Sequence, residues 1–182
     1  RVLFRSYKDK LIYPNAKPNN AHIALAKLEE MGKLKAVITQ NIDGLHQMAG
    51  SKNVLELHGS VHRNYCTKCG KFFDLESMLN LGGNIPYCDN CGSIVKPDVV
   101  LYEEALDSDV ITKTISAISN ADLLIIGGTS LAVYPAASFI DYYKGDYIAL
   151  INKANTVYDK SASLVINKPI GEVLYEAVLR QI

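Results

Sequence analysis

The chain has 182 residues, of which 48% are hydrophobic, and it carries 19 Lys and Arg against 19 Asp and Glu. With a typical domain of about 150 residues, this length fits one domain, or one domain with a modest insertion, and the hydrophobic fraction excludes an intrinsically disordered chain. A formal net charge of +0 is not typical of a general nucleic-acid binder, which is usually strongly basic, so no direct nucleic-acid binding is expected.

The apolar stretches of the chain are short. The longest, around Leu123–Ile126, is far below the roughly 18 residues that a membrane span needs. We therefore expect a soluble globular protein without membrane contact, located in the cytoplasm. The chain opens at Arg1 with no secretory leader or transit segment, and we expect either a fragment or a protein whose beginning was removed.

The first half of the chain predicts one helix and two short strands. Ala21–Met31 reads as a complete helix, because Asn19 or Asn20 can cap its free amides and Gly32 can take the conformation that ends a helix. Ala36–Thr39 predicts a short strand buried on both faces. A polar loop over residues 40–50 separates it from a second strand, Val54–Leu57.

The second half alternates helices and strands. Helices are predicted over Val110–Ile118, over Pro135–Tyr143 with proline at its first position, and over Gly171–Ile182 with Val173, Leu174, Ala177 and Val178 facing inward. Strands are predicted over Leu123–Gly127, Tyr147–Asn152 and Leu164–Ile166. This alternation predicts an α/β fold, a Rossmann-like parallel sheet with helices on both faces.

The segment from His62 to about Pro97 differs in composition. It holds all four cysteines, several glycines and few apolar runs, so we expect no hydrophobic core of its own. We expect a zinc-binding module over residues 62–97 and a Rossmann-like domain over residues 1–61 and 98–182. Part of 1–35 is expected to be a helical segment that belongs with the zinc module in a small second domain.

The cysteines form two pairs, Cys66-x-x-Cys69 and Cys88-x-x-Cys91, with 18 residues between them. This spacing matches the zinc ribbon, in which two tight turns present thiolates at the corners of a tetrahedron. A thioredoxin-like site needs only one such pair, and a disulfide framework is expected in small secreted chains. We expect one structural zinc ion held by four thiolates; replacement of one cysteine by His62 is the alternative.

Polar residues follow four of the predicted strands. They are Gln40, Asn41 and Asp43, then His58-Gly59-Ser60, then Gly128-Thr129-Ser130, and finally Asn152-Lys153. Each group alone is more often a turn or a hydrogen-bonded loop than a binding site. Since ligands of open parallel sheets bind beyond the carboxyl ends of the strands, the combination predicts a cleft for a ligand rich in sugar hydroxyls and phosphate.

Several motifs resemble those of one family in type and in order. Thr39-Gln40-Asn41-Ile42-Asp43-Gly44-Leu45-His46, then Leu55-Glu56-Leu57-His58-Gly59-Ser60, then the two cysteine pairs, resemble the sirtuins, the NAD-dependent protein deacylases. Pro97–Tyr102, Gly128–Ala136 and Ile151–Lys153 continue the resemblance, which covers essentially the whole chain. The pattern of these motifs resembles that of the bacterial members of the family.

The resemblance implies a role for each matching residue. His58 would be the general base, accepting a proton from a ribose hydroxyl after the acyl oxygen has attacked the anomeric carbon. Histidine suits this step, because its ordinary pKa of about 6.5 lies close to neutral pH. Asn41 and Asp43 would frame the nicotinamide and Gln40 would bond its ribose. Gly128, Thr129 and Ser130 would contact the phosphates and a ribose of NAD. Asn152 and Lys153 would lie at the adenosine end. The backbone of Ile170 would provide any contact near the adenine.

The resemblance also implies a substrate and a reaction. Val99, Val100, Leu101 and Tyr102 would pair with the backbone of an acetyl-lysine peptide by strand addition. The reaction would remove the acetyl group from lysine and release nicotinamide and O-acetyl-ADP-ribose. Mono-ADP-ribosyl transfer and a catalytically inactive zinc-ribbon adaptor are the alternatives.

The chain departs from the family pattern in three places. Family members begin with a glycine-rich strand and loop that this chain lacks, so the central first strand would be missing, and we expect these residues alone to bind NAD weakly and turn over little. Glu103 stands where many members have glycine, and Lys96 where many have arginine.

Overall fold

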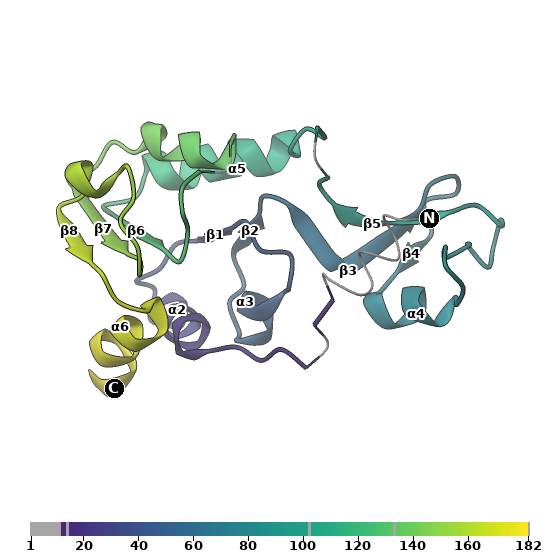
Figure 1. Ribbon diagram of the computed structural model, residues 1–182, viewed down its shortest axis with the longest axis horizontal. Coiled ribbons are helices and arrows are strands. Elements are labelled where there is room, and N and C mark those ends of the chain that lie inside the picture. The colour runs from purple at the N-terminus through teal and green to yellow at the C-terminus, as the bar shows by residue number, and fades with distance from the viewer. Residues whose placement is uncertain (1–11, 14, 102, 133, 182) are drawn as a thin grey trace. The chain divides into compact units, whose positions relative to one another are not determined.

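The computed structural model describes residues 12–13, 15–101, 103–132 and 134–181 (Figure 1). The chain divides into two compact units. The first contains residues 39–44 and 58–106 with the described part of 1–16, and the second contains residues 17–38, 45–57 and 107–182. None of the described helices combines the length and the apolar character that crossing a bilayer demands.

The second unit is built on a parallel sheet. Its strands are β6 (Leu123–Gly127), β7 (Tyr147–Ile151) and β8 (Leu164–Ile166), in the order β6-β7-β8. Helices α2 (Asn20–Glu30) and α6 (Ile170–Ala177) lie on one side of these strands, and α5 (Ser108–Ser119) and the 3-10 helix η1 (Ala136–Tyr142) lie on the other (Figure 1). The predicted α/β fold with helices on both faces is confirmed.

The strand residues alternate between two hydrophobic cores. Ile125, Ile151 and Ile166 pack with Ala24 of α2 and Leu174 of α6. The intervening residues of the same strands face the other way, where Ile126, Leu150 and Val165 pack with Ile140 of η1. Period-two alternation of strand side chains therefore produces two apolar faces that both need covering.

Helix α2 begins where its capping residue predicts. The Asn19 side chain accepts a hydrogen bond from the backbone of Ala21 at 2.9 Å, and the His22 ring reaches back to the Asn19 amide at 3.2 Å. These reciprocal bonds satisfy amides that the first turn of a helix leaves free.

Two predicted helices need correction. The segment Pro135–Tyr143 is a 3-10 helix that begins after Pro135, with tight bonds from Ser138 to Pro135 and from Tyr143 to Ile140. The closing helix α6 ends at Ala177 and is followed by the 3-10 helix η3 (Leu179–Gln181). Ala177 is exposed, because Val178 beyond the helix end takes the core position instead.

Four smaller elements complete the second unit or lead into the first. Strands β1 (Val37–Thr39) and β2 (Val54–Glu56) form a separate two-stranded sheet. A short helix, α3 (Leu45–Met48), lies within the predicted loop 40–50, and the 3-10 helix η2 covers Asp159–Ser161.

The first unit contains an antiparallel sheet in the order β4-β3-β5. Its strands are β3 (Gly59–Cys66), β4 (Phe72–Phe73) and β5 (Val95–Val99), and helix α4 (Leu75–Asn80) begins at the capping residue Asp74. Gly59 and Ser60, expected in a loop, are thus the first residues of a strand.

The expectation that this region lacks a core is wrong. Its buried residues are Val61, Cys66, Phe73, Met78, Cys88, Val95 and Val99. Short strands hide alternate residues, and the two buried cysteines fill apolar positions as small hydrophobic side chains do. The assignment of residues 62–97 to a zinc module, with 1–61 and 98–182 as the other domain, stays a prediction.

Candidate active site and metal centre

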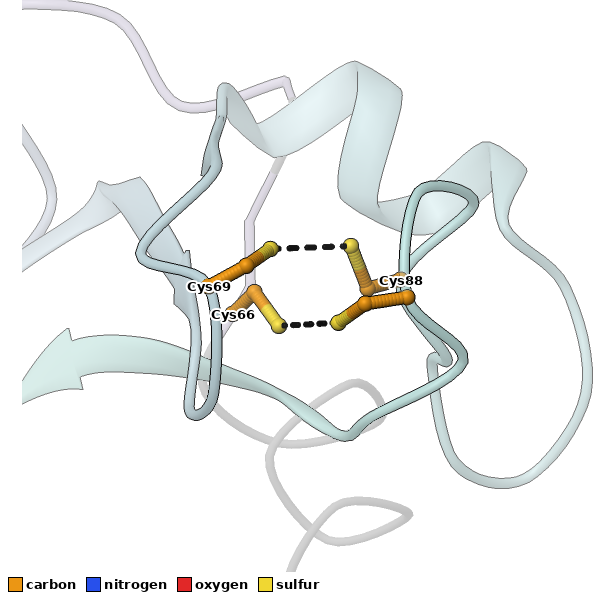
Figure 2. Close-up of side chains that lie close together, drawn as sticks. Cys66, Cys69 and Cys88 are labelled. Atoms are coloured by element: carbon orange, nitrogen blue, oxygen red, sulfur yellow. Dashed lines mark hydrogen bonds between the residues drawn. The ribbon is translucent and has the colours of Figure 1, made fainter.

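The four cysteines gather at one point of the first unit. The sulfurs of Cys66 and Cys91 lie 3.4 Å apart and those of Cys69 and Cys88 lie 3.7 Å apart (Figure 2). All four sulfurs lie within 4.8 Å of one another and none forms a disulfide. A tetrahedral zinc site with Zn–S bonds of about 2.3 Å needs sulfurs roughly 3.8 Å apart, so these residues fit a zinc ion.

Two matching turns present the thiols. The amide of Gly70 donates to the Cys66 carbonyl at 3.1 Å, and the amide of Gly92 donates to the Cys88 carbonyl at 2.8 Å. The Lys71 ammonium reaches the Asp89 carboxylate at 2.7 Å, which joins one turn to the other by a solvent-exposed ion pair. Such exposed pairs add little stability, so a zinc ion bound by the four thiolates would be the stronger link between the turns.

The surroundings shift the pKa values of three of the thiols in different directions. Hydrogen bonding to the Ser93 backbone amide and to Cys66 lowers the pKa of Cys91 to about 6. The Lys71 amide lowers the pKa of Cys69, whereas burial raises the pKa of Cys88 to about 11. Amides aimed at sulfur favour thiolates, the form that a bound metal requires. His62 is not part of this cluster, since its Nε2 donates instead to the Asp43 carbonyl.

The half-buried ring of His58 is held in one tautomer. Its Nδ1 lies 3.0 Å from the backbone carbonyl oxygen of Gln40. A carbonyl only accepts, so Nδ1 carries the hydrogen, and in the neutral ring Nε2 keeps the lone pair. This arrangement gives a side chain able to take up a proton at Nε2.

The backbone next to His58 requires glycine. Gly59 has φ +75°, and a Cβ on it would overlap the carbonyl oxygen of Asp98 on β5. The adjacent carbonyl of His58 accepts from the Val100 amide at 3.0 Å. The close approach of β3 to β5 therefore fixes the backbone from which the imidazole projects.

The loop of residues 40–44 is attached to the same strand. The Ile42 carbonyl accepts from the Val61 amide at 3.0 Å, and the Asn41 amide donates to the Thr39 hydroxyl at 3.0 Å. Together with the bond from His58 to Gln40, these contacts bring Gln40, Asn41, Asp43 and His58 into one unit. Residues 18 and 19 positions apart in sequence thus meet through hydrogen bonds to the backbone carbonyls of this loop.

The segment expected to hold substrate starts in an edge strand. Val99 is paired with Gly59 and buried, while Val100 bonds to His58. The amide and carbonyl of Val99 therefore point away from β3, toward the edge of β5 that pairs with no other described strand. The Leu101 amide is bonded at 3.0 Å to the Glu104 carboxylate. Tyr102 lies outside the described residues.

The second unit has a pocket of about 550 Å³ beyond the carboxyl ends of β6 and β7. Its lining includes four predicted residues: Gly128, Asn152, Lys153 and Ile170. The side-chain amide of Asn152 donates hydrogen bonds to the backbone carbonyls of Thr129, at 3.1 Å, and Ala154, at 3.0 Å. Both of its hydrogens are used, so the side-chain oxygen of Asn152 is left to accept from a ligand hydroxyl.

Some residues predicted to bind the cofactor are placed differently from the expectation. Thr129 and Ser130 do not line this pocket, and the Thr129 hydroxyl accepts from the Leu131 amide at 3.1 Å. The Ile170 side chain packs against Gly127, where any Cβ would collide with it. Asn19 and Lys168 also line the pocket and were missed, because the sequence marks Asn19 only as a helix cap and gives no signal for Lys168.

These features define a class of protein: a Rossmann-like α/β fold that also carries a four-cysteine cluster of zinc-ribbon type. Comparison with known families gives a match to the Sir2 family model over residues 2–135. The chain belongs to the Sir2 family.

Relatives and solved structures agree with this assignment. The chain is 66% identical over 176 residues to an NAD-dependent protein deacetylase of Clostridium perfringens, covering 96% of this chain and 72% of the relative. It is 63% identical over 171 residues to the enzyme of that name from Clostridium acetobutylicum, covering 94% and 70%. A solved structure of Sir2 with p53 peptide and NAD+ is 41% identical, with a TM-score of 0.90 over 98% of this chain and 76% of that one. A structure of Sir2 bound to acetylated peptide has a TM-score of 0.90 at 40% identity, covering 98% of this chain and 77% of that one.

Proposed function

We propose that this protein is an NAD-dependent protein-lysine deacetylase that releases nicotinamide and O-acetyl-ADP-ribose. One observation carries the proposal: the hydrogen bond from His58 Nδ1 to the Gln40 carbonyl, 3.0 Å long, leaves Nε2 as a proton acceptor. The names of the relatives, NAD-dependent protein deacetylases, support it.

Two groups of residues would hold NAD. In the second unit, Asn152, Lys153 and the Ile170 region would take the adenosine end, because their pocket offers a hydroxyl acceptor and a cation. Gly128, which lines the same pocket, would contact phosphate and ribose together with Thr129 and Ser130. When bound, NAD supplies the glycosidic bond whose cleavage releases nicotinamide and leaves the acetyl group on ADP-ribose.

The first unit would serve the nicotinamide end and the reaction. Asn41 and Asp43 would frame the nicotinamide and Gln40 would bond the ribose next to it. His58 would remove a proton from a ribose hydroxyl at Nε2, and its fixed tautomer means that no ring flip is needed first. The four cysteines would hold zinc with no open coordination position, so the metal supports the fold and leaves the chemistry to His58.

An extended acetyl-lysine peptide would bind to the edge of β5. The outward amide and carbonyl of Val99, followed by Val100, Leu101 and Tyr102, would pair with the peptide backbone. Backbone pairing accepts many sequences, so the acyl group would supply most of the selectivity.

The test is nicotinamide release and deacetylation of an acetyl-lysine peptide by the complete protein. His58→Asn keeps an amide able to bond the Gln40 carbonyl but has no Nε2, so it separates the base from its support. We expect both His58→Asn and His58→Ala to lower turnover by about 10²- to 10⁴-fold, with the melting temperature of His58→Asn unchanged.

Three outcomes would contradict the proposal. Full activity of His58→Asn would remove His58 as the base. Nicotinamide release with ADP-ribose transferred to protein, and no deacetylated peptide, would favour ADP-ribosyl transfer. Absence of nicotinamide release from the complete protein would leave the adaptor alternative.

A cytoplasmic location is part of the proposal. It rests on the four free cysteines, since a thiolate metal site persists where thiols are kept reduced.

A further inference from the structure

His62 lies in a bulge of β3 whose shape is fixed from inside. The register between β3 and β5 shifts between Ser60 and Asn64. The Ser60 hydroxyl accepts from the His62 amide at 3.3 Å, and the Asn64 side chain donates to the carbonyls of Val61, at 3.1 Å, and Phe73, at 3.3 Å. Ser60 is 2% exposed and Asn64 is 0% exposed. Bulges of this kind redirect a side chain, and this one redirects His62.

The His62 ring is directed onto residues 43 and 44. Its Nε2 lies 3.0 Å from the Asp43 carbonyl oxygen, and because a carbonyl only accepts, Nε2 carries the hydrogen. The ring also covers Gly44. A Cβ at that position would lie 2.7 Å from His62 Cδ2 and 2.9 Å from Nε2, closer than real Cβ contacts come. Gly44 therefore leaves space that the imidazole fills.

This contact continues a series along the same loop. The carbonyls of Gln40, Ile42 and Asp43 accept in turn from His58, Val61 and His62. The first two bonds hold the residue before and the residue after Asn41. The third holds the backbone of Asp43, the residue whose side chain is proposed to frame nicotinamide.

We propose that His62 is a positioning residue for nicotinamide, acting through the Asp43 carbonyl and Gly44. The inference rests on the proposed function and deepens it. His62 touches no reacting atom; it fixes the loop corner so that the Asp43 side chain meets nicotinamide in one orientation. Loss of the imidazole therefore weakens nicotinamide binding while the edge of β5 keeps its peptide.

Three variants separate the two contacts of His62. His62→Ala removes both the ring and the donor, and His62→Phe keeps a ring over Gly44 without the donor. His62→Gln restores a donor, because its amide reaches about as far as imidazole Nε2. The readouts are the nicotinamide inhibition constant and the KM values for NAD and for acetyl-lysine peptide, measured on the complete protein.

We expect His62→Ala to raise the nicotinamide inhibition constant roughly three- to tenfold, the effect of one hydrogen bond, while the peptide KM stays within twofold. His62→Gln should recover most of the loss and His62→Phe only part of it. An unchanged nicotinamide constant in His62→Ala would overturn the proposal. So would an equal rise in all three constants, which indicates a general loosening of the fold.

Amide hydrogen exchange in the unliganded protein tests the contact without any turnover. A peptide covering residues 40–46 should exchange faster in His62→Ala, whereas β7 should exchange at the wild-type rate. If the wild type releases no nicotinamide, the proposed function fails, yet this measurement still decides whether His62 holds the loop. Unchanged exchange over 40–46 would overturn the proposal.

Gly44 provides an independent check. Gly44→Ala introduces both a collision with the His62 ring and strain at φ +68°, whereas in the His62→Ala background only the strain remains. We expect Gly44→Ala to lower the melting temperature more when His62 is present. Equal losses in the two backgrounds would show that the ring does not lie on Gly44.

Discussion

Glu103 has an unusual backbone conformation for its residue type. Its φ is +71°, in the left-handed region that favours glycine. A side chain in that region costs roughly 1–2 kcal/mol. The residue lies two positions after Leu101, at the end of the segment proposed to bind substrate, so the strain affects the corner that follows that segment.

Replacing Glu103 by glycine should stabilise the protein. Relief of the strain is partly offset by roughly 0.5–1 kcal/mol from the greater freedom of glycine in the unfolded chain, so we expect a net gain of about 0.5–1 kcal/mol in the free energy of unfolding. Glu103→Ala is the matched control, since it removes the carboxylate and keeps the strained backbone. Urea denaturation would measure both; an equal gain in the two variants would assign the effect to charge.

The two histidines near the 40–44 loop are held by backbone carbonyls and, among the residues that the structure describes, not by pairing with other side chains. His58 and His62 both donate to carbonyls of the 40–44 loop, and each bond fixes which ring nitrogen carries hydrogen. The two histidines thereby differ: His58 is left with Nε2 as an acceptor, while His62 uses Nε2 as a donor. Their roles follow from this difference.

At the scale of elements, the turn after β5 is held by one ion pair. The Glu104 carboxylate accepts from the Lys96 ammonium at 2.6 Å and from the Leu101 amide at 3.0 Å. These contacts, Lys96 first, lower the pKa of Glu104 from its ordinary value of 4.5. The charged form is therefore favoured by folding, and it links the strand to the turn that follows it.

The pH dependence of this link has a defined sign. A lowered pKa in the folded state stabilises the protein above the ordinary pKa of the carboxyl, and that contribution disappears as the pH falls through the lowered value. Glu104→Gln should therefore have a lower unfolding midpoint than wild type at pH 7, by a small margin because the pair is exposed. The two midpoints should converge as the pH falls below 4.5, the ordinary pKa of the carboxyl, as measured by urea titration at a series of pH values. A constant difference from pH 7 to pH 3 would exclude the ion pair as the cause.

Local patterns predicted the three parallel strands, α2 and α5 of the second unit, but not its short helices α3 and η2, and they missed the elements of the first unit. α2 has its cap at Asn19, and β6, β7 and β8 are apolar runs, so nearby residues define each of them. β3 contains a bulge that breaks its period-two pattern. β5 reads as a loop because it contains Lys96, Pro97 and Asp98, and proline is accepted there only since β5 is an edge strand.

Part of the candidate site could also be predicted from the sequence, and part of it could not. The strand-end positions of Asn152 and Gly128 marked them for the pocket that they now line. The position of His62 depends on the bulge and on the absent side chain at Gly44, and neither can be seen in the sequence around His62. Residues that act through tertiary backbone contacts leave no local pattern.

At the scale of the whole molecule, the two units have separate hydrophobic cores. The core of the first unit includes Cys66 and Cys88, whereas the cores of the second lie on the two faces of β6–β8. Structural zinc sites contribute roughly 10–16 kcal/mol of apparent binding free energy, more than a small core supplies alone. The metal and the first core should therefore be lost together.

Removal of zinc should unfold the first unit and leave the second. After chelation, we expect amides of β3, β5 and α4 to lose protection from hydrogen exchange, while those of β6, β7 and β8 retain it. Activity should disappear as well, because His58 and the 40–44 loop depend on β3 for their positions. Restoring zinc should recover both signals, and a chelator already saturated by calcium serves as the control.

Two results would contradict this expectation. Equal loss of protection in β6–β8 would show that the chain unfolds as one cooperative body. Full protection of β3 without metal would show that the apolar side chains around Cys66 and Cys88 hold the first unit alone.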